Sequence, residues 1–240
     1  MHYAWFFWSL ILLAVWVIVY FLTKEKESRS EMLKMSFWTS LLGLTEPLFV
    51  PEYWNPPTLF DLAQRTGFDL ESFIFSFAIG GIATAIYELI FPLRHEKMSV
   101  EEMNGKQHRF HWLAVVLPPF LFVFLIFANV MNPIYSAIFS LIFGFFAAWY
   151  CRPDLKGKMA ASGLIFLGIY FIYFQILILL YPGYVEAVWN FSNISGKLIF
   201  GIPLEELLFA FFFGLYWASV YEHLNWYKIN WKFSNNFVTL

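Results

Sequence analysis

Seven apolar runs divide this chain of 240 residues, and each is long enough, or nearly so, to cross about 30 Å of hydrocarbon. They cover approximately residues 3–22, 35–50, 70–92, 111–130, 132–151, 159–181 and 199–223. Hydrophobic residues make up 60% of the chain and charged residues only 13%, a balance that soluble domains do not show. The sequence therefore predicts an integral membrane protein made of α-helices.

The basic residues predict the orientation of these helices. Of the 15 lysine and arginine residues, 13 lie in the first, third and fifth loops and the C-terminal tail, and only Arg65 and Lys197 lie in the other loops. By the positive-inside rule, the N-terminus is expected outside and the C-terminus in the cytoplasm. The first residues lack the basic start and cleavage site of a signal peptide, so the first run is expected to be a retained helix.

One helical segment occurs twice. Residues 67–88 align without a gap to residues 201–222, at an offset of 134 positions, and eight of the 22 aligned residues are identical. The identical residues include an acid near the start of each copy, Glu71 and Glu205, and another at its end. Because the copies are the third and seventh predicted helices, they cross the membrane in the same direction, which predicts parallel repeats.

The repeat divides the chain into two similar units. We expect the first unit over residues 1–93, an inner loop and linker helix over 94–131, the second unit over 132–225 and a cytoplasmic tail over 226–240. The predicted fold class is therefore an all-α integral membrane protein of seven transmembrane helices, with two parallel three-helix repeats joined by a linker helix.

A Trp-Asn pair recurs in the outer loop before each repeated helix. Trp54-Asn55 and Trp189-Asn190 are offset by 135 positions, one more than the helices. Taken singly, such tryptophans are typical of the aromatic belt at a membrane interface. Because the pair recurs as a unit, we interpret it as part of a substrate-binding site.

Carboxylates in membrane segments are costly and often functional. Glu205 and Glu206 begin the last helix directly after Pro203 and Leu204, and Glu71 begins the third helix. Glu46 lies near the outer end of the second helix in largely apolar surroundings. An acid in the first turn also suits the helix dipole, so a purely structural role is the alternative for the Glu205-Glu206 pair.

Aromatic side chains share the helical face of these acids. On the last helix this face carries Phe209, Phe213 and Tyr216, and on the third helix it carries Phe75. Burial favours a neutral carboxylic acid, and aromatic faces attract cations. Acids in a dry aromatic cavity therefore suit proton addition to an alkene that is dissolved in the bilayer.

The other recurring residues indicate helix packing and the inner membrane edge. Gly80 and Gly214 would allow close helix contacts on the opposite face. Glu88 and Glu222 each follow a tyrosine at the inner edge and are expected to be structural or interfacial. The first two inner loops, over residues 24–34 and 94–109, mix both charge signs and are expected to be solvated connectors, and we assign His95 and His108 no role.

Several kinds of site have no support in the sequence. It contains no aspartate cluster, no phosphate-binding glycine loop, no dinucleotide fingerprint and no lysine within a predicted span that could hold retinal. The single cysteine, Cys151, excludes an internal disulfide, and no His/Cys group has the spacing of metal ligands. We therefore expect no metal site, and we expect no nucleic-acid partner.

The second unit resembles a known family. The sequence IPLEELLF at residues 202–209, with Trp189-Asn190 before it and Tyr221-Glu222 after it, resembles the membrane lycopene cyclases of the heterodimeric or fused bacterial, archaeal and fungal type. That family carries a P-x-E-(E/D)-x-x-F signature and consists of two similar three-helix units. The resemblance covers both units of this chain.

The first unit departs from this pattern. Asp69 replaces the proline and Ser72 replaces the second acid, so only Glu71 carries over from the signature. Family members often have a further acid at the outer end of the helix before the loop. Glu46 takes that place in the first unit, but Leu180 does so in the second. The two units are therefore expected to differ in catalysis.

The resemblance implies a lycopene β-cyclase of carotenoid biosynthesis, an isomerase that adds a proton to a terminal double bond, closes a six-membered ring and releases a proton. It implies no net redox change and no dissolved cofactor. It also implies a lycopene-like polyene substrate in the bilayer, other carotenoid-pathway enzymes as partners, and the cell membrane of a prokaryote as location. The alternative is a non-enzymatic seven-helix protein that binds a polyene or transports a small solute.

Among the acids, we expect Glu205 to be the principal proton donor or its direct partner, with Glu206 assisting. Adjacent helical residues diverge by about 100°, so both side chains cannot point fully into one cavity. Glu205 has an equivalent in Glu71, whereas Glu206 aligns with Ser72. Glu71, Glu46 and Glu206 are the carboxylic acids expected to share its proton.

Overall fold

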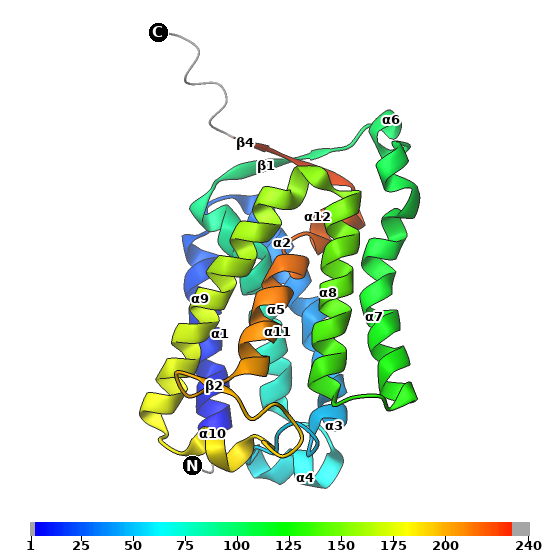
Figure 1. The fold of residues 1–240 in the computed structure, drawn as a ribbon. Helices are drawn as coiled ribbons and strands as arrows, with labels where there is room; N and C mark the ends of the chain where they lie inside the picture. Colours follow the sequence, from blue (N-terminus) through cyan, green and yellow to red (C-terminus); the bar gives the residue numbers. More distant parts are fainter. Residues whose placement is uncertain (1–2, 232–240) are drawn as a thin grey trace.

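The computed structural model describes residues 3–231 and consists mostly of long helices that run side by side (Figure 1). The long helices are α1 (Ala4–Leu22), α2 (Lys26–Ser40), α5 (Leu70–Ile90), α7 (His111–Ala128), α8 (Pro133–Cys151), α9 (Lys156–Leu180) and α11 (Leu204–Trp217). We call the end of the bundle where α1 begins the outer end, and the opposite end the inner end, following the predicted orientation. Residues 1 and 2 and residues 232–240 of the predicted tail, with Lys232, lie outside the described part.

Within residues 3–231, six helical segments are long and apolar enough to cross a membrane. They are Ala4–Leu22, Leu70–Ile90, Lys106–Ala128, Pro133–Cys151, Pro153–Leu180 and Leu204–Asn225. Many large apolar side chains on their outward faces are exposed, Phe127 at 86% and Leu179 at 79% among them, as expected of surfaces that face lipid. This arrangement is consistent with the predicted all-α membrane class.

The second predicted helix, over residues 35–50, has a different form. Helix α2 begins nine residues earlier and carries several charges, and it continues as the 3-10 turn η1 (Leu41–Thr45) and the short helix α3 (Glu46–Phe49). The turn brings Gly43 so close to α5 that an added Cβ would lie 2.9 Å from the Cγ of Phe73. The predicted count of seven spans therefore stays a prediction for this segment.

Two sets of three helices share one arrangement. Helix α5 packs against α1 and α2, and helix α11 packs against α8 and α9. Helices α5 and α11 lie in the interior and contact each other and α9, while α7 packs on α8 at one side of the bundle (Figure 1). Two three-helix units joined by a linker helix would produce this pattern of neighbours.

The recurring glycines lie where these helices approach most closely. A Cβ added to Gly80 would lie 2.1 Å from the Oγ1 of Thr39 on α2. A Cβ added to Gly214 would lie 2.9 Å from the Cβ of Phe166 and 3.1 Å from the Cα of Gly163, both on α9. Neither place has room for a side chain, so the predicted packing role of the two glycines is confirmed.

The two Trp-Asn loops pair with each other at the outer end. The amide of Asn55 donates to the carbonyl of Val188 at 2.9 Å, and the amide of Asn190 donates to the carbonyl of Tyr53 at 2.9 Å. The two tryptophans between these residues form an antiparallel bridge. Donors and acceptors are each 135 positions apart, so the loops exchange equivalent bonds, as an approximate two-fold axis between them requires.

Short elements complete the two ends of the bundle. At the inner end, strand β1 (Leu93–Lys97) pairs antiparallel with β4 (Tyr227–Trp231), so this part of the predicted loop and tail forms a sheet instead of a solvated connector (Figure 1). At the outer end, β2 (Leu198–Ile199) pairs with β3 (Ile202–Pro203). The remaining elements are η2 (Leu59–Asp61), α4 (Leu62–Thr66), α6 (Val100–Met103), η3 (Lys106–Phe110), η4 (Pro153–Leu155), α10 (Tyr184–Val188) and α12 (Val220–Asn225).

Candidate active site

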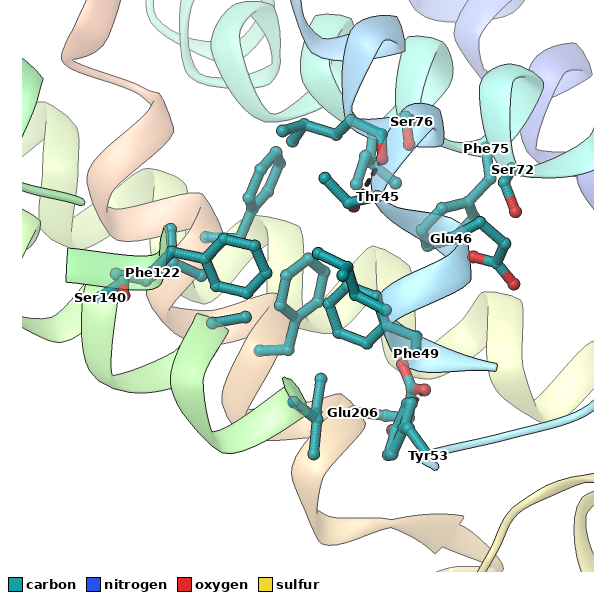
Figure 2. A pocket seen from close by; sticks show the side chains of 18 of the residues that line it. Thr45, Glu46, Phe49, Tyr53, Ser72, Phe75, Ser76, Phe122, Ser140 and Glu206 are labelled. Atoms are coloured by element: carbon teal, nitrogen blue, oxygen red, sulfur yellow. Dashed lines mark hydrogen bonds between the residues drawn. The ribbon is translucent and has the colours of Figure 1, made fainter. Parts of the chain in front are cut away.

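An apolar cavity of about 530 Å³ lies between the helices and reaches the outer end of the bundle. Helices α1, α5, α7, α8, α9 and α11 line it, and α3 and the two Trp-Asn loops line its outer part. Among the described residues that line the cavity, Glu46 and Glu206 are the only carboxylates, and none is basic. Figure 2 shows Glu46 and Glu206 on one side of the view and Phe122 and Ser140 on the other. The cavity therefore suits an apolar ligand that meets carboxyl groups at one end.

Glu206 lies in the first turn of α11 and is surrounded by neutral hydrogen-bond donors. Its carboxylate accepts from the Oη of Tyr53 at 2.6 Å and from the Oη of Tyr170 at 2.6 Å. The Nε1 of Trp189 donates to it at 3.1 Å. Burial and the adjacent Glu206 carboxylate raise the pKa of Tyr53 well above its usual range, so its phenol keeps its proton and remains a donor. The three donors orient Glu206 without neutralising its charge.

Glu46 begins helix α3, and its environment differs from that of Glu206. The side chain is 7% exposed, and its Oε1 has no hydrogen-bond partner within residues 3–231. A buried carboxylate without a cation or a full set of donors is favoured in its neutral form, because burial penalises the charge. The two carboxyl groups of the cavity therefore differ in their hydrogen bonds, because Glu206 accepts from three donors and the Oε1 of Glu46 accepts from none within the described residues.

Glu205 and Glu71 occupy equivalent places in the repeat, and neither lines the cavity. The Oε1 of Glu205 accepts from the Oη of Tyr135 at 2.7 Å and from the amide of Ser195 at 2.9 Å. The Oε1 of Glu71 accepts from the amide of Leu59 at 2.7 Å. Each carboxylate thus attaches the outer loop that leads into its own helix, which gives the recurrence of this acid a structural reason.

The helical geometry separates Glu205 from its neighbour Glu206. As the divergence of about 100° between adjacent residues requires, Glu206 faces the cavity while Glu205 faces the loop. That Glu205 is the principal proton donor stays a prediction, and its contacts support a loop-holding role instead. Burial does not distinguish Glu205 from Glu206, because both side chains are buried.

All six aromatic residues predicted to bind substrate line the cavity. They are Trp54, Phe75, Trp189, Phe209, Phe213 and Tyr216. Asn55 and Asn190 do not, since their amides join the two loops. The sequence reasoning missed Tyr53, whose place beside the recurring Trp-Asn pair was a signal, and Tyr170, which no repeated motif marks.

A second group of buried acids, which we call the inner ion cluster, consists of Glu31, Glu88, Glu222, Lys158 and His95. The Nζ of Lys158 lies 2.6 Å from Glu88, makes a short hydrogen bond to Glu222 and lies 3.7 Å from Glu31. The Nε2 of His95 lies 3.3–3.4 Å from an oxygen of each of the three carboxylates. All five side chains are at most 1% exposed. The cluster joins α2, α5, α9, α12 and β1.

Lys158 and His95 correct two expectations. His95 is expected in a solvated inner loop, but its side chain is 1% exposed. Lys158 is expected in the inner loop before the sixth helix, but helix α9 already begins at Lys156 and Lys158 lies within the bundle. Burial alone would lower the pKa of His95, but hydrogen bonds with Glu222 and Glu88 and the charge of Glu31 raise it to about 11. Buried carboxylates need such partners, because an unpaired buried charge is strongly destabilising.

The helical bundle, its apolar cavity and its buried acids define a membrane protein that holds an apolar ligand against carboxyl groups. Residues 132–224 match the family model described as lycopene cyclase. This match covers the second unit and supports assigning the chain to the lycopene cyclase family, as the resemblance predicted. It supports a cyclase enzyme of carotenoid biosynthesis that is associated with the membrane and acts on a lipophilic carotenoid. No curated protein and no solved structure matches the chain.

Proposed function

We propose that this protein is a lycopene β-cyclase that forms a cyclic end group by proton addition, ring closure and proton loss. The observation that carries the proposal is the pair Glu206 and Glu46 at one end of an apolar, aromatic cavity. The apolar lining supports a polyene site over a path for a polar solute, which the transport alternative would need. The family match in the second unit supports the same reading.

In the proposed reaction, Glu46 is the acid. Its neutral carboxyl group transfers a proton to the terminal double bond of the polyene, which leaves a tertiary carbocation. The next suitably placed double bond attacks this cation, so one carbon–carbon bond forms and a six-membered ring closes. Contrasting environments of two carboxyl groups commonly separate an acid from a base in this way.

Glu206 is the proposed base. Its three neutral donors stabilise the carboxylate form, which attracts the carbocation and then removes a proton next to it. The ring double bond forms from that C–H bond, and product and substrate are isomers. Exchange with solvent returns Glu206 and Glu46 to their starting states. The faces of Phe75, Phe209 and Phe213 in the cavity lining would stabilise the cation meanwhile.

The proposed setting includes the finer features of the predicted fold. The α2–η1–α3 segment would provide the seventh crossing, with the N-terminus outside, in the cell membrane of a prokaryote. The two parallel units would differ in chemistry, because the position of Glu206 is occupied by Ser72 in the first unit. Other enzymes of the carotenoid pathway would then deliver and remove the polyene within the same bilayer.

The test supplies lycopene to membranes that contain the full chain, in H₂O and in D₂O. We expect cyclic isomers of lycopene in both solvents, with one deuterium retained for each ring formed in D₂O. Lycopene that is bound by the folded protein but never converted would contradict the proposal and support the polyene-binding alternative.

The role of Glu46 is tested in the same assay with Glu46→Gln. We expect cyclisation to fall by about 10²–10⁴-fold, the usual contribution of a general acid, because glutamine cannot donate this proton. Retained binding of lycopene, measured by its absorption in the purified variant, shows that the cavity is intact. Unchanged cyclisation would exclude Glu46 as the acid.

A further inference from the structure

A cluster of two histidines and the cysteine lies at the inner end, apart from the residues that line the cavity. His108 belongs to η3, His111 begins α7 and Cys151 ends α8, and all three are buried. One ligand atom from each lies within 4.8 Å of the others. No such cluster is expected from the sequence, because the chain has a single cysteine and no His/Cys group with the spacing of metal ligands, but the packing of α7 on α8 brings Cys151 and His111 together.

The distances in this cluster are close to those of a metal site. The Sγ of Cys151 lies 3.4 Å from the Nδ1 of His108 and 3.4 Å from the Nδ1 of His111. Tetrahedral zinc, with Zn–S about 2.3 Å and Zn–N about 2.0–2.1 Å, places sulfur and nitrogen ligands about 3.6 Å apart. The two observed separations therefore need little adjustment to hold an ion between them.

The ring of His111 is oriented as metal ligands commonly are. Its Nε2 lies 2.8 Å from the carbonyl of His223, and a carbonyl only accepts, so Nε2 carries the hydrogen. The lone pair of Nδ1 then faces Cys151, and a hydrogen bond from the other ring nitrogen to a carbonyl is a frequent support of metal-binding histidines. The ring of Trp226 stacks on His111, with 3.5 Å between centroids and 15° between planes, and fixes its orientation further.

The surroundings also leave the cluster available to a cation. The Nε2 of His108 is buried and has no hydrogen-bond partner within the described residues, whereas its Nδ1 contacts the Sγ of Cys151. The neighbouring Arg152 is paired with Asp154 at 2.6 and 2.9 Å, which offsets its charge. In contrast, the acids of the inner ion cluster already contact the ammonium group of Lys158, which occupies the place that a metal ion would need.

We propose that His108, His111 and Cys151 bind a zinc ion through two imidazole nitrogens and a thiolate. Two nitrogen ligands and one sulfur ligand suit zinc and related d-block ions, and three protein ligands leave a fourth position for water. Binding would release the thiol proton of Cys151. The ion would fasten the start of α7 to the end of α8, and so join the linker helix to the second unit.

The test uses the full chain, purified in detergent from cells grown with added zinc, so that the ion can enter during folding. We expect about one zinc ion per chain by mass spectrometry of the metal, as a single three-ligand site requires. Growth with cobalt should give a thiolate-to-cobalt absorption band and the visible bands of a tetrahedral ion. Cys151→Ala and His108→Gln should each lose both signals.

Matched variants keep the test decisive. Gln107→Ala changes an exposed neighbour of His108 and should retain the metal. Cys151→Ser preserves the size of the side chain, and its circular dichroism reports whether loss of metal follows loss of fold. The proposal is overturned if folded wild-type protein contains no more zinc than Cys151→Ala, or if cobalt gives no thiolate band.

Discussion

The two ends of the bundle both bury carboxylates, but they supply them with different partners. At the outer end, Glu71, Glu205 and Glu206 accept from phenols, an indole and backbone amides. Neither these three acids nor Glu46 form a salt bridge within residues 3–231. In the inner ion cluster, three carboxylates surround the ammonium group of Lys158.

The difference indicates which acids are free to exchange a proton. In the inner ion cluster, Lys158 and His95 hold Glu88 and Glu222 in the charged state, because protonation of either would leave a buried cation underpaired. Neutral donors orient a carboxylate without that constraint, so the charge can change during a reaction. Recurrence in the repeat did not make this distinction, since Glu71, Glu88, Glu205 and Glu222 all recur.

The largest effect is expected for Glu206→Gln. The amide cannot accept a proton from the substrate, so cyclisation should fall by about 10²–10⁴-fold. The measurement is the conversion of lycopene per folded chain in membranes, with protein amount determined by fluorescence-detected gel filtration.

Glu205→Gln is the matched control for Glu206→Gln. Glutamine keeps an oxygen that can accept from Tyr135 and Ser195, so the loop should stay attached and cyclisation should fall by less than about tenfold, or about 1.4 kcal/mol. Equal and complete loss in both variants would remove the distinction between them and restore Glu205 as the principal donor.

Lys158→Met should have the next largest effect, on stability and not on chemistry. Removing the cation leaves three buried carboxylates without their main partner, which typically costs about 3–5 kcal/mol. Thermal unfolding in detergent should show a strongly lowered midpoint, while conversion per folded chain is largely kept. A variant that is stable but inactive would show that the inner ion cluster takes part in catalysis.

Glu71→Ala should have a smaller effect. It removes the acceptor for the amide of Leu59 and loosens the first outer loop, at a cost of about 1.5–3 kcal/mol for a hydrogen bond to a charged group. Limited proteolysis should then cut within residues 55–66 faster than in the wild type. Unchanged cleavage would mean that this bond does not hold the loop.

The last prediction concerns the pH dependence that His95 contributes. Its pKa is about 11 in the folded protein and about 6.5 in an unfolded chain, so its stabilisation is complete below about pH 6.5 and is lost as the pH rises toward 11. Between about pH 6 and pH 9, the unfolding midpoint of the wild type should therefore decrease more than that of His95→Asn. Parallel pH curves for the two proteins would contradict this role.

The sequence predicted those features that depend on local patterns. Hydropathy indicated the membrane helices, and the helical period placed Phe75, Phe209 and Tyr216 on the face that lines the cavity. The choice between Glu205 and Glu206 could not be made in this way, because both begin the same helix and their roles depend on partners from other segments, such as Tyr53 and Tyr135.

Long-range contacts explain what else the sequence reasoning missed. The inner ion cluster combines residues from five elements, and no local pattern relates Lys158 to Glu31 or His95. The group of His108, His111 and Cys151 likewise depends on the packing of α7 on α8. Such clusters depend on which distant helices pack together, and local sequence patterns do not indicate these contacts.

The bridge between the two Trp-Asn loops has a consequence for how such a protein can change over generations. Its reciprocal bonds join backbone amides and carbonyls, which every residue except proline supplies in full. A change of side chain elsewhere in either half therefore removes none of the groups that form this seam. One half was free to carry Ser72 where the other carries Glu206, and the halves still meet in the same way. A seam made of main chain would allow two similar units to diverge in sequence without losing the contact between them.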